Sequence, residues 1–373
     1  NGCDRSASTW RRVSTLRGRW HWGNSRTSWV RPVTTEVPEL ARRRYLDACI
    51  AGDYPAALLV CQALRQSGLT WSALVRSLLS PALWRVGDLW MYGKVTVAQE
   101  QRVTAITEAV IQTLLSDSPT PRANARVLLT GPEGEWHVLP SRMVALVLRQ
   151  LGWDVLQLTP AIPPEDLLTL ARTEHGHVAG ISCSLPGNLV PAWQSITALR
   201  QAGFRVLAGG RAFVAYPGLA QSLGADAGAH DLLQAHEVLL EWVTQPAPGP
   251  RPPTLQRRWE GLESTWAATE RIVADAGVLA VDIEGVALAG EVLRQDLTLM
   301  LTTAVAAALA QRAAILADHF AWYEDLLSVG GVDPGSAPAL LRALSRVLPA
   351  DADDIRDVIA EVVSRPRARQ SPA

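Results

Sequence analysis

The sequence is poor in cysteine and lysine and has no long apolar run without charges. Only four of its 373 residues are cysteines (Cys3, Cys49, Cys61 and Cys183), and no two of them form a CxxC pair. This excludes a small secreted domain held together by disulfides. We therefore expect a reduced, cytoplasmic protein.

The charge balance and the hydropathy pattern exclude two further classes. The net charge is −1 and Lys94 is the sole lysine, so bulk positive charge for holding nucleic acid is missing. The longest apolar-rich region, 276–316, is interrupted by Asp282, Glu284, Glu291, Arg294 and Asp296. It is therefore not expected to span a membrane. We also recognise no secretory signal.

The first half of the chain divides into a tail and a helical region. Residues 1–34 hold seven arginines and four tryptophans without an apolar period, which predicts a disordered basic tail or, alternatively, an arm that touches nucleic acid or membrane. Residues 35–118 contain four amphipathic segments separated by short loops, with Asp53, Thr70 and Thr96 as helix caps. This pattern predicts an antiparallel four-helix bundle, with Trp84 in its core.

The second half predicts an α/β domain and a further helical domain. Residues 124–246 alternate buried apolar runs with amphipathic helices, which is typical of a doubly wound parallel sheet of the Rossmann type. The predicted strands are 126–129, 154–158, 178–182, 205–208 and a short one near 225–227. After a proline-rich linker, 246–253, residues 254–364 are helical. We thus expect a multidomain α and α/β protein.

Polar residues follow the predicted strands at the edge where ligands bind in such sheets. His137 lies in the first strand-to-helix loop, and Glu135 is placed to hold its ring, as carboxylates do for metal-ligating histidines. Ser182 ends the third strand, and Gly209 and Gly210 end the fourth. A lone loop histidine without a role is the alternative.

These stretches resemble the cobalamin-binding domain family, whose pattern is D-x-H-x-x-G, then S-x-L, then G-G. In that family the histidine becomes the lower ligand of cobalt, and the displaced nucleotide tail passes the small serine and glycine side chains. The resemblance assigns cobalt ligation to His137. It assigns contact with the cofactor to Glu135, Trp136, Ser182, Ser184, Gly209 and Gly210.

Three positions depart from the family pattern. Glu135 stands where aspartate is usual, which keeps the carboxylate. Pro140 stands where glycine is usual, and Ser184 where leucine is usual, although Leu185 follows. Together with the bundle, the resemblance covers residues 36–246.

The bundle is similar to the cap of the light-sensing cobalamin repressors of the CarH and LitR type. Their signature is tryptophan, nine residues, then Glu-His; here Trp90 and Glu100 keep the spacing, and Gln101 replaces the histidine. The resemblance implies that Trp90 and Glu100 cover an adenosyl group above the cobalt. The cap histidine that binds cobalt after light in those repressors is Met91 here. Their DNA-binding helix-turn-helix has no counterpart in residues 1–34, so no direct nucleic-acid partner is expected.

The order of domains resembles the photocobilins, which pair adenosylcobalamin with biliverdin. In the C-terminal domain this resemblance rests on domain order alone. His319 and Tyr323, with Arg312, are the residues we would assign to a non-covalently bound bilin. A packed output or dimerisation domain is the alternative.

The sequence thus predicts a light sensor that is not an enzyme. Cleavage of the Co–C bond would release the adenosyl group and drive a rearrangement of domains or oligomers. The expected partners are a second copy of the chain, in a light-dependent way, or a downstream effector protein. A corrinoid carrier for methyl transfer is the main alternative, and a module that has lost its cofactor is a third.

Overall fold

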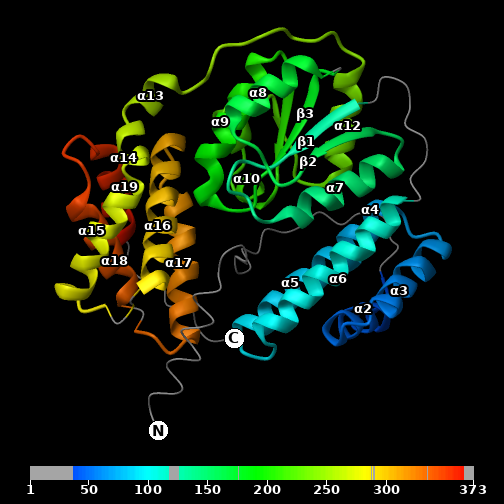
Figure 1. Ribbon diagram of the computed structural model, residues 1–373, viewed down its shortest axis with the longest axis horizontal. Helices are drawn as coiled ribbons and strands as arrows, with labels where there is room; N and C mark the ends of the chain where they lie inside the picture. Colours follow the sequence, from blue (N-terminus) through cyan, green and yellow to red (C-terminus); the bar gives the residue numbers. More distant parts are fainter. Residues whose placement is uncertain are drawn as a thin grey trace. The chain divides into compact units, whose positions relative to one another are not determined.

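The computed structural model describes residues 37–116, 126–174, 176–286, 288, 290–333 and 335–364 (Figure 1). The tail predicted for residues 1–34 lies outside this part of the chain. The described residues form two compact units. One unit holds the N-terminal helices and the sheet; the other holds the helices from Thr254 onward together with the short segment Leu185–Val190.

The N-terminal helices form the predicted four-helix bundle. Their ends are set by local capping: Asp53 accepts from the Ala56 amide at 3.0 Å, and Thr70 accepts from the Ala73 amide at 3.2 Å. Thr96 and Gln99 bond reciprocally, as in a capping box. The helical segments are α2 (Glu39–Ala51), α3 (Tyr54–Gln66), α4 (Trp71–Leu74), η1 (Val75–Leu79), α5 (Ser80–Met91) and α6 (Val97–Ser116).

The third helix of the bundle contains a π-helical turn shortly before Pro81. In η1 the Ser80 amide bonds to the Val75 carbonyl, five residues back instead of four. Pro81 follows directly, lacks an amide hydrogen and crowds the preceding turn. A widened turn accommodates that ring and continues the helix into α5, which carries Trp90.

The sheet is parallel, with the strand order β2-β1-β3-β4-β5. Helices α7 and α12 lie on one side of the strands, and α8 and α9 on the other (Figure 1). The predicted strands are confirmed to within two residues. The strands are β1 (Arg126–Thr130), β2 (Asp154–Leu158), β3 (Val178–Ser182), β4 (Arg205–Gly209) and β5 (Ala227–Gly228).

Helices connect these strands, as the predicted alternation requires. Between β4 and β5 the helical segment is split into two short helices, because Gly218 between them adopts a left-handed backbone with φ 79°. The connecting helices are α7 (Val138–Gln150), α8 (Pro164–Thr173), α9 (Leu189–Gln201), α10 (Arg211–Val214), α11 (Leu219–Ser222) and α12 (Leu232–Val243).

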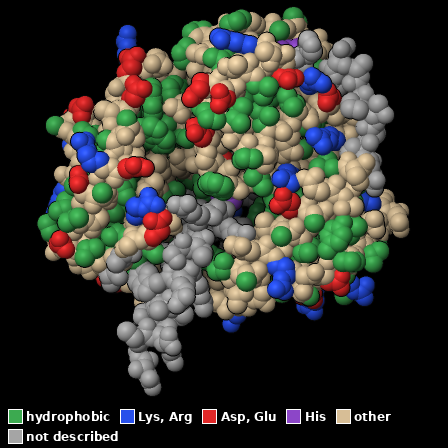
Figure 2. All heavy atoms as spheres, viewed as in Figure 1, with side chains coloured by type: hydrophobic (Ala, Val, Ile, Leu, Met, Phe, Trp, Pro, Cys, Tyr) green, Lys and Arg blue, Asp and Glu red, His purple; other side chains and the backbone are tan. Residues whose placement is uncertain are grey.

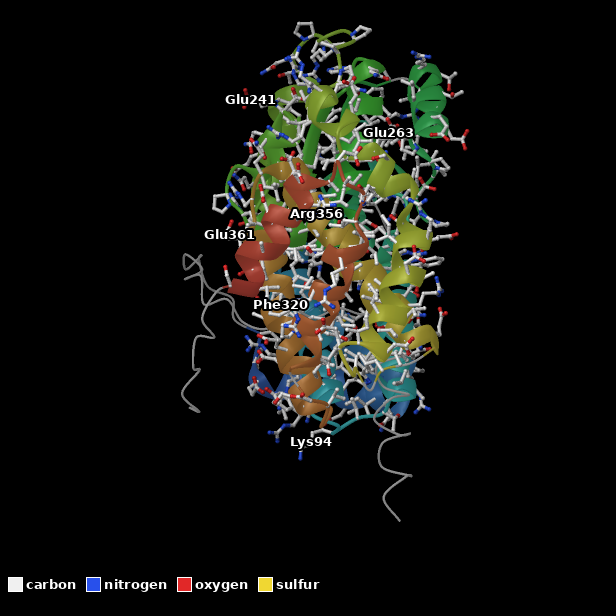
Figure 3. The ribbon with its side chains drawn as sticks, turned by 90° about the vertical axis from the view of Figure 1, so that its left-hand side faces the viewer. Lys94, Glu241, Glu263, Phe320, Arg356 and Glu361 are labelled. Atoms are coloured by element: carbon white, nitrogen blue, oxygen red, sulfur yellow. The ribbon has the colours of Figure 1, made fainter. Side chains whose placement is uncertain are left out.

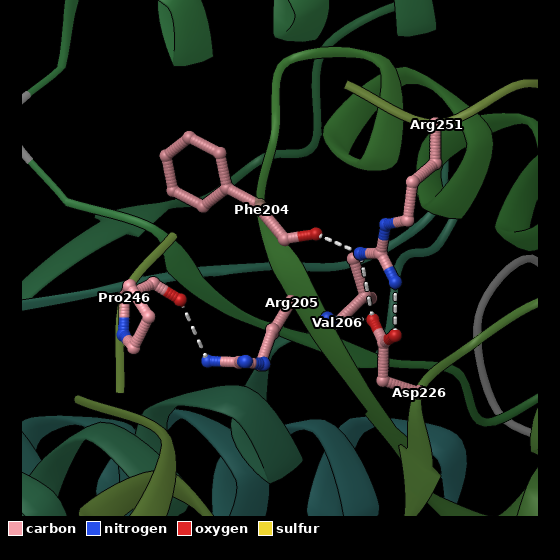
Figure 4. Close-up of polar contacts among 6 residues, drawn as sticks. All are labelled: Phe204, Arg205, Val206, Asp226, Pro246 and Arg251. Atoms are coloured by element: carbon pink, nitrogen blue, oxygen red, sulfur yellow. Dashed lines mark hydrogen bonds and ion pairs between the residues drawn. The ribbon is translucent and has the colours of Figure 1, made fainter. Parts of the chain in front are cut away.

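The linker after the sheet is tied to the strand edge by two arginines (Figure 4). Arg251 pairs with the Asp226 carboxylate and also donates to the Phe204 carbonyl. Asp226 in turn accepts from the Val206 amide at 2.8 Å, and Arg205 donates to the Pro246 carbonyl at 3.2 Å. The proline-rich segment 246–253 is therefore anchored at both of its ends.

The C-terminal unit is helical, as predicted for residues 254–364, and its first stretch, 255–276, is broken twice. That stretch forms three pieces, since Gly261 ends the first and the Thr269 hydroxyl bonds to the Trp266 carbonyl at the second break. Arg356 of α19, labelled in Figure 3, donates to the carbonyl of Leu348 at the C-terminal end of α18. The helices are α13 (Gln256–Glu260), α14 (Glu263–Ala267), α15 (Thr269–Asp282), α16 (Gly290–Ala310), α17 (Ala314–Val329), α18 (Ser336–Val347) and α19 (Asp353–Ser364).

Helix α16 is the central helix of this unit. By length and composition it could cross a membrane, but 72% of its most apolar window is buried inside the protein, as is usual for the core helix of a globular domain. On the face of the protein drawn in Figure 2, acidic and basic side chains are interspersed. That face carries no patch of one charge sign among the described residues.

Candidate cofactor site

The loop between β1 and α7 holds a buried carboxylate that grips the ring of His137. Glu135 is 7% exposed. Its Oε1 lies 2.6 Å from His137 Nδ1 and accepts from the His137 amide at 3.0 Å. Its Oε2 accepts from the Ser184 amide at 2.8 Å. The carboxylate therefore joins the first loop to the loop after β3.

The hydrogen bonds keep Glu135 ionised despite its burial. Burial is the largest single influence and raises the pKa of the carboxyl, but the bonds from His137 and from the Ser184 amide outweigh it. The net result is a pKa below that of an ordinary glutamate. An ionised Glu135 fixes the ring orientation of His137 and favours the tautomer with the proton on Nδ1.

His137 can supply one ligand to a metal. Its side chain is 17% exposed, and it stands at the N-terminal end of α7. With Nδ1 facing Glu135, Nε2 is the ring nitrogen that is suited to ligate. One imidazole provides one ligand, so a metal held here brings its other ligands with it, as cobalt in a corrin ring does.

The ends of β3 and β4 meet in tight backbone contact beside this loop. Ser182 and Gly209 are partners in the sheet register. The Cys183 amide donates to the Gly209 carbonyl at 3.0 Å, and Gly210 has φ 88°. A side chain at Gly210 would come within 2.8 Å of the Cys183 nitrogen, so glycine is required for these loops to approach each other.

The two bundle residues that were assigned to the cap are both buried. Trp90, near the end of α5, is 9% exposed, and its indole Nε1 is buried without a hydrogen-bond partner. Glu100, in the first turn of α6, is 5% exposed. Buried glutamates are rare outside specific sites. Gln101 is exposed and so lies on a different face of α6 from Glu100.

The bundle is packed directly onto the helix that follows His137. Met143 and Leu146 of α7 belong to the same apolar core as the bundle helices. Arg142 of α7 pairs with Glu108 of α6 at 2.6 Å, and Gln150 donates to the Leu114 carbonyl at 3.0 Å. Helix α6 therefore links Glu100 to the element that positions His137.

Several predicted residues lie elsewhere or act differently. Trp84 is 51% exposed, so its assignment to the bundle core was wrong: the buried positions of α5 follow Ala82, Val86 and Trp90, and Trp84 is on the opposite face. Trp136 is 70% exposed. Ser184 was chosen for its side chain, but what it gives Glu135 is its backbone amide.

Sequence reasoning missed an electrostatic interaction between a carboxylate of the bundle and an arginine of the sheet domain. Arg211 follows Gly210 directly, and its pKa is lowered by burial and raised by the charge of Asp88 on α5. Burial raises the pKa of Asp88, which Arg85 and Arg211 lower. An arginine directly after the two glycines was the signal in the sequence that could have indicated this interaction.

In the C-terminal unit, two of the three residues proposed for a bilin, His319 and Tyr323, are buried. The Tyr323 hydroxyl donates to Asp296 at 2.6 Å, and His319 stacks on Trp322. Burial raises the pKa of Asp296 to about 7 and lowers the pKa of His319 to about 3. His319 and Tyr323 are 2% and 1% exposed, so both are core side chains here.

Two family comparisons cover the bundle and the sheet. Residues 125–234 and residues 41–115 each match a family described as a B12 binding domain. The HTH-type transcriptional repressor CarH of Myxococcus xanthus is 35% identical over 137 residues, which are 36% of this chain and 46% of that repressor. The chain therefore spans less than half the length of this curated relative.

Solved structures with similar folds are more distant. The monomethylamine corrinoid protein of Methanosarcina barkeri is 18% identical, with a TM-score of 0.44 over 53% of this chain and 96% of its own. A cobalamin-binding protein from Desulfitobacterium hafniense DCB-2 is 16% identical, with a TM-score of 0.30 over 54% and 98%. Residues 41–115 and 125–234 thus match B12 binding domains, which indicates a cobalamin-type cofactor, and 137 residues of the chain are similar to CarH.

Proposed function

We propose that the protein is a light sensor that holds adenosylcobalamin between its bundle and its sheet. The observation that carries this proposal is the pairing of two features in one compact unit. His137 is held by an ionised, buried Glu135, and the bundle packed on the following helix carries the buried Trp90 and Glu100. Similarity to a repressor of the CarH type supports a regulatory role over an enzymatic one.

The lower side of the site fits a corrin with a histidine ligand. Nε2 of His137 would bind the cobalt, and Glu135 would hold the ring in place. Ser182, Gly209 and Gly210 would line the passage for the nucleotide tail. These three residues at the strand ends have a small side chain or none, as the passage of such a tail requires.

The upper side fits a nucleoside better than a methyl group. A buried indole N–H without a partner costs about 1–3 kcal/mol, and Trp90 Nε1 is in that position. A nucleoside offers acceptors for it and a flat face for the indole ring. Glu100 would accept from the nucleoside hydroxyls. A methyl group offers neither kind of contact.

When bound, adenosylcobalamin supplies a Co–C bond that green light cleaves. Trp90 and Glu100 would then lose the group that they contact, and α5 and α6 would be free to shift. Because α6 is fixed to α7 by Arg142 and Glu108, a shift of α6 changes the packing of the bundle on the sheet. The output would be self-association or binding of an effector protein.

A corrinoid carrier for methyl transfer is the second candidate, because it needs the same lower ligand. The two functions differ in what the bundle must cover. We would measure binding of adenosylcobalamin and methylcobalamin in the dark and record absorption spectra before and after green light. A sensor should prefer the adenosyl form and change its spectrum on illumination. Equal binding without release of the adenosyl group would favour the carrier.

A bilin in the C-terminal unit stays a proposal that rests on domain order. His319 and Tyr323 are fully covered, so biliverdin would have to open this core in order to reach them. Biliverdin would be added to the protein and the mixture passed through a sizing column. A red absorption band that elutes with the protein supports the bilin. No such band would assign this unit to output or dimerisation.

A further inference from the structure

The loop after β3 is shared between the cofactor site and the C-terminal helices. Its first part ends at Ser184, whose amide is held by Glu135. The next six residues, Leu185–Val190, belong to the compact unit of the C-terminal helices. They include the 3-10 turn η2 (Pro186–Asn188) and the first residues of α9. Leu189 and Val190 are completely buried.

The contact of this loop with α16 is close enough to require a glycine. A methyl group at Gly187 would lie 2.7 Å from the Thr302 hydroxyl oxygen and 3.1 Å from Leu299 Cδ1. The Thr303 hydroxyl would be 3.5 Å away. The backbone of η2 is therefore seated against one turn of α16, with no space for a side chain between them.

The loop and α16 each carry one buried polar atom without a hydrogen-bond partner among the described residues. These are Nδ2 of Asn188 and Oγ1 of Thr303. Buried polar groups that are left unpaired are unfavourable, so a small shift of the loop that brings them a partner would be favoured. Such a contact is suited to having two arrangements of similar free energy.

We propose that Leu185–Val190, seated on α16, couples the state of the cofactor site to the C-terminal unit. The physical connection consists of His137, the Glu135 carboxylate, the Ser184 amide and then the loop itself. A change in ligation at His137 alters the position of Glu135 and so the hold on the start of the loop. The packing of the loop against Leu299 and Thr302 of α16 then changes. This inference rests on the proposed function for the binding of cobalamin at His137 and for light as the signal.

The test uses hydrogen exchange of the full-length protein, followed by mass spectrometry of peptides from α16 and the loop. Four states are compared: without cofactor, with hydroxocobalamin, with adenosylcobalamin in the dark, and with adenosylcobalamin after green light. Binding of hydroxocobalamin should change protection in 185–190 and 297–303. Because this comparison needs no photochemistry, it separates failure of the coupling from failure of the light-sensing function. The absorption spectrum of each sample shows whether cobalamin is bound and whether it responds to light.

Gly187→Ala is the perturbing variant, since η2 has a turn conformation that alanine also adopts. It should bind cobalamin with an unchanged spectrum but lose at least half of the protection change in α16. The double variant Gly187→Ala with Thr302→Ala lacks the hydroxyl that the new methyl group would meet. It should therefore regain the protection change in α16. Gly261→Ala is the control, because its nearest atom would be 3.5 Å from the added methyl group.

The outcomes separate cleanly. An α16 response that is lost in Gly187→Ala, restored by Thr302→Ala and kept in Gly261→Ala supports the coupling. An α16 that does not respond to cobalamin in the unmodified chain overturns it, as does a full response in Gly187→Ala. If Gly187→Ala fails to fold, the comparison between Thr302→Ala alone and the unmodified chain decides, since a loosened contact should weaken the same response.

Discussion

Replacing Glu135 with glutamine should weaken cobalamin binding through His137 without unfolding the protein. The carboxylate accepts three hydrogen bonds, from the His137 ring, the His137 amide and the Ser184 amide. Glutamine has the same shape, but its amide NH₂ would face an N–H donor. The variant therefore keeps the size of the side chain and loses the charge and part of the acceptor set.

The magnitude follows from those contacts. A hydrogen bond to a charged group contributes about 1.5–3 kcal/mol. Loss of one of them amounts to roughly 10- to 100-fold in affinity, which agrees with the effect of removing a carboxylate that orients a metal-binding histidine. Because burial alone would raise the pKa of Glu135 and these bonds lower it, the carboxylate is ionised at neutral pH and its charge is available to be lost.

The assay is a spectroscopic titration with hydroxocobalamin that follows replacement of the cofactor's own base by imidazole. Glu135→Asp should recover most of the affinity, because it restores the carboxylate. Glu133→Gln changes an exposed glutamate of the same loop and is the matched control. Equal affinity of Glu135→Gln and the unmodified chain would refute the role assigned to this carboxylate.

Three further predictions follow from buried groups. Gly210→Ala should lower the free energy of unfolding by about 2–5 kcal/mol in a urea titration, whereas Gly218→Ala, with a similar φ but nothing within 4 Å, should lose only about 1–2 kcal/mol; equal losses would contradict the contact. The pKa of Asp296 is raised from 3.8 to about 7, so the folded state binds this proton more tightly than the unfolded state. The free energy of unfolding therefore falls as the pH rises through that range. Asp296→Asn should therefore gain stability over the unmodified chain from pH 4 to 7, by up to roughly 4 kcal/mol in thermal melts; a constant difference would count against it. Trp90→Phe and Glu100→Gln should each reduce the preference for adenosylcobalamin over methylcobalamin about tenfold, measured by dark titration, and an unchanged preference would remove the residue from the cap.

The sequence predicted well what is set by local signals. Strand positions follow from short apolar runs, and helix starts follow from caps such as Thr70 and Thr96, whose bonds lie within three residues. The match to B12 binding domains confirms the class of cofactor that was inferred from the spacing of His137, Ser182 and the two glycines. Light-driven chemistry and the bilin stay predictions.

The features that could not be predicted from the sequence depend on contacts between residues that are distant in the chain. Trp84 is apolar and helical, but which face of α5 is buried is set by the neighbouring helices. Asp296 looked like one of several charges that break an apolar run, since its partner Tyr323 is 27 residues away. The role of Ser184 was hidden because its backbone carries the contact, and every residue but proline offers the same amide.

The central claim is that His137 is the lower ligand of the cobalt. Electron paramagnetic resonance of the protein with cobalt(II) cobalamin tests it directly, because the coupling pattern reports the isotope of the axial nitrogen. Protein made with nitrogen-15 histidine should show a changed pattern relative to unlabelled protein, and His137→Ala should abolish the difference. An identical pattern in labelled and unlabelled protein would mean that the cofactor keeps its own base, and the site as described here would be wrong.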